Sequence, residues 1–301
     1  MSWDPRHLPS QAGTTVVVTG AGRGIGYFVA EQLAAAGARV ILTTRGDTVA
    51  LDSIRSRVPG AQLEHVELEL GSLASIHAAA ASLRELGPID VLINNAGLTG
   101  GVRERETTSD GLERMVGTNA YGPFALTALV LPAVRGRIVN LGSLSTRLAR
   151  ADLSDFEQRE GTYSASRAYA YSKHGVHAFA LELDRRLRAS GSAVQSLLAH
   201  PGFALDGSAP RLPGITDRSP AGQLLVERLL RPVAHGKDRG AWPVVRAAID
   251  PDARGGEFYG PSRSVTGPPV LTKPVAQSAD PAFGAEFWRL AEAATGVAFD
   301  V

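Results

Sequence analysis

The sequence predicts an α/β fold in which helices cover both faces of a doubly wound parallel sheet of about seven strands. Short apolar, β-branched runs alternate with longer helical patterns from residue 14 to residue 199, and this alternation is typical of β-α-β units. Hairpin signals are lacking between the runs, so the strands are expected to be parallel and joined by right-handed crossovers. The runs are apolar throughout, as expected for strands buried on both faces. The strands are expected over 14–19, 39–44, 62–68, 89–93, 137–141 and 193–199.

The helices are expected between these strands, and single residues mark where two of them begin or end. In the first helix, Ile25, Phe28 and Leu33 fall on one face. Gly37 ends this helix, because glycine readily adopts the left-handed conformation of a C-cap. Ser72 is a suitable N-cap for the third helix. The helices are expected over 25–36, 48–58 and 72–86, within 108–134, and over 166–189.

The chain after residue 200 has a different character. Residues 201–220 contain three glycines and four prolines, a density of turn-forming residues typical of a loop. Further helices are expected over 221–230, 240–249 and 282–294, with a short strand over 257–259. No linker, charge block or internal repeat divides the sequence. We therefore expect one domain over 1–301, with an N-terminal arm over 1–13 and an extension over 203–250 that covers the substrate.

Composition and charge exclude several classes of protein. Lys and Arg number 31 and Asp and Glu number 30, for a formal net charge of +1, which argues against a nucleic-acid partner. The sequence has no cysteine, so it forms no disulfide and no thiolate metal site. No apolar run reaches the ~18–20 residues of a membrane span, and residues 1–13 lack the apolar segment of a signal peptide. We expect a cytoplasmic protein without a membrane span.

A glycine-rich turn, TGAGRGIG over 19–26, joins the first strand to the first helix. Glycines allow a tight turn and let a pyrophosphate approach the unpaired N–H groups at the start of the helix. An ordinary strand-to-helix loop is the alternative. The position between a buried strand and an amphipathic helix favours a dinucleotide site. The expected cofactor contacts here are Gly20, Gly22, Arg23, Gly24, Ile25 and Gly26.

In this turn, spaced Gly-x3-Gly-x-Gly, the sequence resembles the short-chain dehydrogenase/reductase family. The segments NNAG over 94–97 and GGEFYGP over 255–261 extend the resemblance to about residues 14–294, and the later segment is similar to the retinol-dehydrogenase-like branch. The resemblance implies a single-domain Rossmann fold and a nicotinamide cofactor. It places Asn95, Ala96 and Gly97, and later Pro201 and Gly202, beside that cofactor.

The end of the second strand indicates which nicotinamide nucleotide is used. An NAD enzyme places an acidic residue there to bind the ribose 2′-hydroxyl, whereas this sequence has Arg45. A guanidinium suits a 2′-phosphate, and Arg23 can approach it from the other side. We therefore expect NADP(H) rather than NAD(H); the alternative is that both arginines are merely solvated. The resemblance places Glu69 and Leu70 near the adenine, where the family usually has an aspartate.

A tyrosine and a lysine supply the expected proton-transfer chemistry. Tyr169 and Lys173 are four residues apart, so they project from one face of a helix. An ammonium about 4 Å from a phenol, at an effective dielectric constant of ~20, contributes on the order of 4 kcal/mol. That is enough to lower the pKa of the phenol by roughly three. Tyr163, four residues before Arg167, and Tyr171, which has no cationic partner, fit this role less well.

Two further polar residues match the family's catalytic set. Ser143 follows the fifth strand, where the family has a serine that bonds the substrate oxygen; Ser145 is the alternative. Asn119 matches an asparagine that holds a water for a proton relay through Lys173, although an asparagine can also simply cap or bend a helix. The resemblance also implies that Lys173 binds the nicotinamide ribose. Gly142, where the family often has a second serine, is expected to be a harmless difference.

No metal site is expected. His174 and His177 lie one helical turn apart, but no third ligand stands at a matching offset, so helix-surface or packing roles are favoured. Leu205 and Asp206 stand where the family often has a threonine that holds the nicotinamide carboxamide.

These residues predict an NADP(H)-dependent oxidoreductase that interconverts a ketone or aldehyde with an alcohol, with Tyr169 as general acid or base. Two alternatives are a non-catalytic NADP(H)-sensing protein and an enoyl (C=C) reductase, whose family members usually place more residues between tyrosine and lysine. A bulky, weakly polar substrate is expected, and a homo-oligomer is possible. The apolar residues that suggest this substrate, and that can equally belong to the core, are Phe203, Leu205, Leu212, Leu224 and Trp242.

Overall fold

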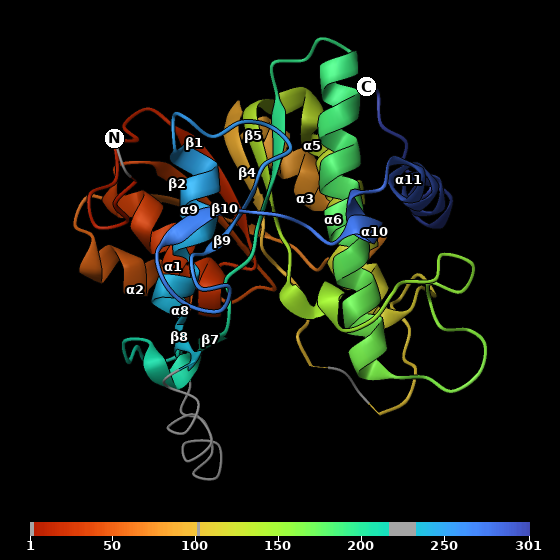
Figure 1. Cartoon of the computed structure of the whole chain (residues 1–301). Helices are drawn as coiled ribbons and strands as arrows, with labels where there is room; N and C mark the ends of the chain where they lie inside the picture. The colour runs from red at the N-terminus through yellow and green to blue at the C-terminus, as the bar shows by residue number, and fades with distance from the viewer. Residues whose placement is uncertain (1–2, 101–102, 217–232) are drawn as a thin grey trace.

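The computed structural model describes residues 3–100, 103–216 and 233–301, and within them a central eight-stranded sheet lies between two layers of helices (Figure 1). The strand order is β10-β9-β6-β5-β4-β1-β2-β3. Neighbouring strands pair in parallel except β9 and β10, which are antiparallel. The strands are β1 (Thr15–Thr19), β2 (Arg39–Thr44), β3 (Gln62–Glu67), β4 (Ile89–Asn94), β5 (Val134–Leu141), β6 (Gln195–Ala199), β9 (Phe258–Pro261) and β10 (Pro269–Thr272).

The doubly wound parallel sheet is confirmed, with one strand more than expected. The additional strand, β10, is only four residues long and begins with a proline. Proline cannot donate to a ladder and is confined to edges and strand ends, which is where β10 lies. The proline and the short length therefore hid this strand in the sequence.

Two layers of helices cover the sheet. One layer contains α3, α5, α6 and α11, and the other contains α1, α2 and α9, as Figure 1 shows on the two sides of the strands. The bounds are α1 (Gly24–Ala35), α2 (Val49–Arg57), α3 (Leu73–Glu85), α4 (Arg114–Val116), α5 (Gly122–Val130), α6 (Ala165–Ala189), α8 (Lys237–Gly240), α9 (Trp242–Ile249), α10 (Ala276–Ala279) and α11 (Pro281–Thr295).

The central strand β1 shows why these strands are apolar throughout. Val17 belongs to the core under α3 and α6, whereas Val16 and Val18 belong to the core under α1 and α9. Successive side chains of a strand point to opposite faces, so a strand covered on both faces has no polar positions. In the middle of the sheet, β1 pairs with β2 on one side and β4 on the other. The strand order therefore reverses between β1 and β4, and ligands of such sheets bind at this reversal.

The helix ends expected from single residues are observed. Gly37 has a φ of +96°, in the left-handed region, directly after α1. The Ser72 hydroxyl accepts a hydrogen bond from the backbone N–H of Ser75 at 3.3 Å and caps α3.

The stretch over 108–134 differs from the single helical region expected there. Helix α4 begins only at Arg114, and a π-helical turn, Gly117–Tyr121, follows before α5. At the start of α5 a Cβ on Gly122 would collide with the backbone carbonyl of Leu70. Close packing of this helix onto the chain after β3 thus requires glycine.

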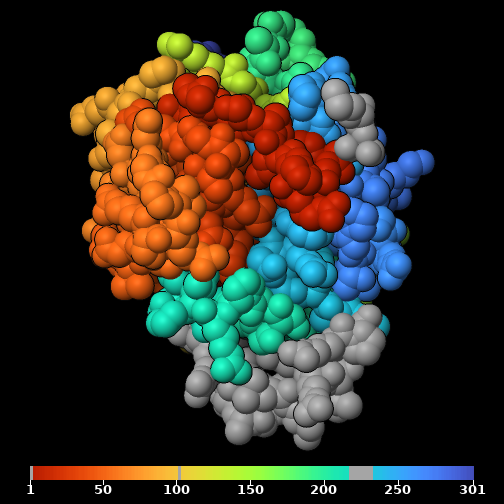
Figure 2. Space-filling model, turned by 90° about the vertical axis from the view of Figure 1, so that its left-hand side faces the viewer, coloured from red at the N-terminus to blue at the C-terminus, as the bar shows by residue number. Residues whose placement is uncertain are grey.

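Part of the chain after β6 lies at one edge of the sheet. Strand β7 (Ala204–Leu205) pairs with β8 (His235–Gly236) in a two-stranded parallel sheet that the sequence analysis did not anticipate. Figure 2 shows residues after β6, in teal, across the lower edge of the N-terminal half. The helix expected over 221–230 lies outside the described residues. Among the residues that the structure describes, no helix has the length and apolarity needed to cross a membrane.

Candidate active site

The expected site residues follow four neighbouring strands at their carboxyl ends. Gly20 follows β1, Asn95 follows β4, Ser143 follows β5, and Pro201 follows β6. These strands are adjacent and parallel, so the four segments meet at one edge of the sheet, where the strand order also reverses. The fold therefore brings the cofactor turn and the proposed catalytic residues together.

Packing against neighbouring backbone requires two glycines of the turn. A Cβ on Gly20 would lie 2.8 Å from the Cα of Ala96, and a Cβ on Gly26 would collide with the carbonyl of Gly20. Asn95 reinforces this packing, because its Nδ2 donates to the Thr19 carbonyl at 2.7 Å. The turn is thus held rigidly against the segment after β4.

The start of α1 remains available to an anion. Its N-cap residue is Arg23, no side-chain hydrogen bond caps the helix, and its first turn contains no acidic residue. Gly24 has a φ of +62°, and the nearest atom to a Cβ placed on it is Nζ of Lys237, at 3.5 Å. N–H groups at a helix start bind anions when nothing else satisfies them. The start of α1 therefore has N–H groups that no side chain caps, and Ile25 is partly buried there.

The residues expected at the adenosine end contact each other. Arg45 Nη1 lies 3.6 Å from Glu69 Oε2, and both side chains are largely exposed. The second oxygen of Glu69 accepts a hydrogen bond from the backbone N–H of Gly71 at 2.9 Å. The Leu70 side chain is buried in the core, so only its backbone can face a ligand.

A hydrogen bond joins Tyr169 and Ser143. The Tyr169 hydroxyl donates to Ser143 Oγ at 3.4 Å, from α6 to the end of β5. Ser143 Oγ also accepts from the backbone N–H of Ser145 at 3.1 Å. The hydroxyl of Ser145 is buried instead. Ser143 is therefore the serine that faces the tyrosine.

Lys173 is buried, and its ammonium donates to the Leu141 carbonyl at 2.7 Å. Burial lowers the pKa of Lys173 to about 8. Its Nζ lies 5.9 Å from the centre of the Tyr169 ring. The expectation that Lys173 lowers the pKa of the phenol is wrong for this arrangement. Burial raises the pKa of Tyr169, and only the hydrogen bond with Ser143 opposes the rise.

Asn119 lies in the π-helical turn and links two segments of the site. Its Oδ1 accepts from the backbone N–H of Leu98 at 2.7 Å, and its Nδ2 donates to the Leu98 carbonyl and to Ser172 Oγ, each at 3.0 Å. Ser172 in turn donates to the carbonyl of Tyr169 at 2.8 Å. Both amide hydrogens of Asn119 are used, so the amide can only accept a further hydrogen bond. π-Helical turns are frequent at functional sites.

Gly142 is not a harmless replacement for serine, because His177 depends on it. A Cβ at position 142 would collide with the imidazole of His177, whose Nε2 accepts a hydrogen bond from the backbone N–H of Ser143 at 3.3 Å. His177 is 1% exposed, and burial holds its pKa well below the ordinary value. The imidazole is therefore neutral, and through this hydrogen bond it holds the backbone of Ser143 in place.

The two histidines of α6 are buried rather than on the surface of the helix. His174 contacts Ser278 Oγ through Nδ1 at 2.7 Å and the Ala149 carbonyl through Nε2 at 2.8 Å. His177 packs edge-on against Phe258. The described residues form no group of three or more His, Asp or Glu side chains that could hold a metal ion.

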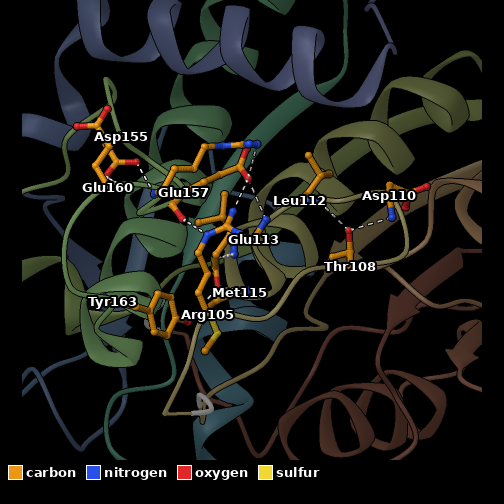
Figure 3. Close-up of polar contacts among 12 residues, drawn as sticks. Arg105, Thr108, Asp110, Leu112, Glu113, Met115, Asp155, Glu157, Glu160 and Tyr163 are labelled. Atoms are coloured by element: carbon orange, nitrogen blue, oxygen red, sulfur yellow. Dashed lines mark hydrogen bonds and ion pairs between the residues drawn. The ribbon is translucent and has the colours of Figure 1, made fainter.

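A buried carboxylate, which the sequence analysis missed, anchors the long segment between Ser143 and Tyr169 (Figure 3). Glu113 accepts hydrogen bonds from the backbone N–H groups of Met115 and Val116 at 2.9 and 2.7 Å, and from the Tyr163 hydroxyl at 3.0 Å. Burial and this carboxylate raise the pKa of Tyr163 to about 12. Tyr163 is thus a structural tyrosine, which leaves Tyr169 beside the serine.

A second carboxylate completes this anchor. Glu157 accepts from Arg105 at 3.3 Å and from the backbone N–H of Glu113 at 2.9 Å, as Figure 3 shows. Tyr171, the other tyrosine considered, stacks on Phe156 in the core. Together these contacts fix the start of α4, and hence the turn that carries Asn119.

At the end of β6, the backbone is held by two histidines. The Gly202 N–H donates to His200 Nδ1 at 3.2 Å, and His235 Nε2 donates to the Pro201 carbonyl at 2.7 Å. Asp206 is paired with Lys237, at 2.6 Å between Oδ2 and Nζ. Lys237 also lies beside Gly24 of the glycine turn, a position that the sequence analysis did not identify because nothing local marks it.

A dinucleotide turn, together with serine, tyrosine and lysine at the same sheet edge, defines an NAD(P)-dependent oxidoreductase that acts on CH–OH and C=O groups. The profile of the short chain dehydrogenase family matches residues 14–205. The chain belongs to the short-chain dehydrogenase/reductase family and to its retinol-dehydrogenase-like branch.

Two curated relatives illustrate the branch. Polyprenol dehydrogenase of Mus musculus is 37% identical over 265 residues, which cover 83% of this chain and 76% of that protein. Retinol dehydrogenase 13 of Homo sapiens is 39% identical over 209 residues, 65% of this chain and 61% of that protein. The match to the retinol dehydrogenase thus spans about three fifths of its length.

Solved structures have the same fold. An uncharacterized protein from Mycobacterium paratuberculosis is 33% identical, with a TM-score of 0.82 and complete coverage of both chains. The angucycline C-6 ketoreductase LanV, solved with bound NADP, is 26% identical with a TM-score of 0.64, over 84% of this chain and 95% of LanV.

Proposed function

We propose that the protein interconverts an apolar ketone or aldehyde with its alcohol, using NADP(H), and that Tyr169 transfers the proton. The observation that carries this proposal is the hydrogen bond from Tyr169 to Ser143, at the sheet edge that also carries the glycine turn. A carbonyl oxygen that accepts hydrogen bonds from both hydroxyls would receive its proton from Tyr169 and would be held in position by Ser143.

The residues at this edge fit a dinucleotide. The uncapped start of α1 suits its diphosphate, and Gly24 leaves room for the approach. Arg45 directly follows β2 and suits a 2′-phosphate. Its guanidinium would leave its contact with Glu69 to bind that phosphate. NADP bound to LanV supports this preference. When bound, the nicotinamide supplies the hydride.

The protein's own residues then have separate roles. Ser143 orients the carbonyl oxygen, and Tyr169 donates its proton to that oxygen in reduction and accepts it in oxidation. With a pKa of about 8, Lys173 is mostly charged at neutral pH, and its proposed role is to donate hydrogen bonds to the nicotinamide ribose. Asn119 keeps this part of α6 in place through Ser172.

The substrate is proposed to be bulky and weakly polar. Leu148 and Phe203 are 83% and 37% exposed on the segments that follow β5 and β6. The names of two relatives, a polyprenol and a retinol dehydrogenase, denote long apolar alcohols. Leu212 is buried in the core, and α9 packs against the sheet. We therefore limit the proposed substrate cover to residues 203–216 and 233–240; residues 217–232, with Leu224, lie outside the described residues.

The proposal is tested by incubating the purified protein with NADPH or NADH and a panel of carbonyls, with product analysis. The panel would contain retinal, an isoprenoid aldehyde, an aromatic ketone and an α,β-unsaturated ketone. Alcohol products formed with NADPH would support the proposal. Reduction of the carbon–carbon double bond would indicate an enoyl reductase, and NADPH binding without turnover of any compound would indicate a sensing protein.

A further inference from the structure

Lys237 lies over the start of the cofactor helix α1, although it belongs to the C-terminal part of the chain. Its Nζ is 3.5 Å from the position that a Cβ on Gly24 would occupy. Lys237 is the first residue of α8 and directly follows β8. The lysine therefore reaches the phosphate-binding turn from the segment that we propose covers the substrate.

The backbone that carries Lys237 is anchored on both sides. Gln32 of α1 donates through Nε2 to the Asp238 carbonyl at 2.9 Å. On the other side, His235 donates to the Pro201 carbonyl at 2.7 Å. A cation held in this way loses little conformational freedom when it binds a ligand.

The ammonium pairs with Asp206, at 2.6 Å between Nζ and Oδ2. The register between β7 and β8, with Leu205 opposite Gly236, brings these two residues together. Their side chains are partly buried, at 25% and 31% exposed. Only a partner with more negative charge than one carboxylate, such as a diphosphate, would replace Asp206.

Positive groups lie around Gly24 at the start of α1. The start of α1 carries the positive end of the helix dipole, its N-cap is Arg23, and its first turn has no acidic residue. Lys237 adds a full positive charge beside them. Asp206 pairs with Lys237 and Asp238 follows it in α8, but neither carboxylate belongs to the start of α1, where a diphosphate would place two negative charges.

We propose that Lys237 binds the diphosphate of the dinucleotide by exchanging Asp206 for a phosphate oxygen. Binding of the cofactor then releases Asp206, which directly follows β7, from its ion pair with Lys237. This inference rests on the proposed function, because it takes the dinucleotide as the ligand.

The test measures dissociation constants by NADPH fluorescence for the wild type and for Lys237→Gln, Lys237→Arg and Asp206→Asn. Arg239→Gln is the matched control, because Arg239 lies two residues away and is exposed over Trp242. We expect Lys237→Gln to weaken NADPH binding at least tenfold, with a smaller dependence on salt. Lys237→Arg should restore most of the affinity, Asp206→Asn should tighten binding several-fold, and Arg239→Gln should stay within twofold.

A ligand that has no diphosphate shows whether Lys237 acts on the diphosphate or on another part of the dinucleotide. Adenosine 2′-monophosphate should bind equally well to the wild type and to Lys237→Gln, because it offers Lys237 no phosphate at Gly24. Equal NADPH affinity of Lys237→Gln and Arg239→Gln would overturn the inference, as would an equal loss of adenosine 2′-monophosphate binding. If the wild type bound neither NADPH nor NADH, the proposed function would fail too, so the two failures are distinguishable.

Discussion

The imidazole of His177 occupies the space that a side chain at position 142 would need, and it bonds the backbone N–H of the next residue, Ser143. The glycine and the histidine are 35 residues apart in the sequence. Their contact lets a buried neutral ring support the serine that faces Tyr169. A substitution at either position should therefore alter the effect on stability of a substitution at the other.

Replacing Gly142 with serine should destabilise the protein by about 1–3 kcal/mol, because the added atoms overpack the space behind Ser143. Turnover should fall as Ser143 is displaced. The double variant Gly142→Ser/His177→Ala removes the collision and should recover part of the lost stability. Urea unfolding of the wild type, both single variants and the double variant measures this coupling. Additive effects of the two changes would contradict it.

Replacing Tyr169 with phenylalanine should lower turnover at least ~100-fold, the lower range for general acid–base catalysis. The affinity for NADPH should be unchanged, because the ring remains. Tyr171→Phe is the matched control, since Tyr171 stacks in the core two residues away, and it should keep most of the activity. Steady-state rates and NADPH titrations measure both. Full activity of Tyr169→Phe would remove this residue from the mechanism.

Lys173 should make stability rise with pH. Burial holds its folded-state pKa at about 8, below the ordinary value of ~10.4. Between these values the unfolded chain binds more protons than the folded one, so the free energy of unfolding increases with pH. From pH 7.5 to 9.5 the gain is on the order of 2 kcal/mol. Lys173→Met should lack this gain in urea unfolding; an identical pH dependence of both proteins would refute the assignment.

Replacing Arg45 with glutamine should weaken NADPH binding about tenfold to a hundredfold, as loss of a charged hydrogen bond to the 2′-phosphate implies. NADH affinity should change little. Glu69→Gln should tighten NADPH binding, because it frees Arg45 from its partner. Arg55→Gln, an exposed arginine paired with Asp52, is the control. Equal losses of affinity for NADPH and NADH would show that Arg45 does not bind the 2′-phosphate.

The sequence was sufficient for the parallel sheet, its first six strands and the glycine turn. These features depend on local patterns: continuous apolar runs, helical periodicity, and glycines where the backbone requires them. The pairing of Tyr169 with Lys173 on one helix face is also local, since it follows from a spacing of four residues. Strand β10 was missed because a short, proline-containing edge strand is stabilised by its neighbour and not by its own residues.

Only the tertiary structure decided how the site residues meet. The raised pKa of Tyr169 and the lowered pKa of Lys173 come from burial, which depends on every element that packs around them. His177 behind Gly142 and Lys237 over Gly24 join residues far apart in the sequence, and no local pattern records such a contact. The sequence by itself determined which chemical groups the protein possesses and which elements carry them, because those follow from short-range periodicity. Folding determined their partners and their charges, because distance and desolvation exist only once the chain is packed.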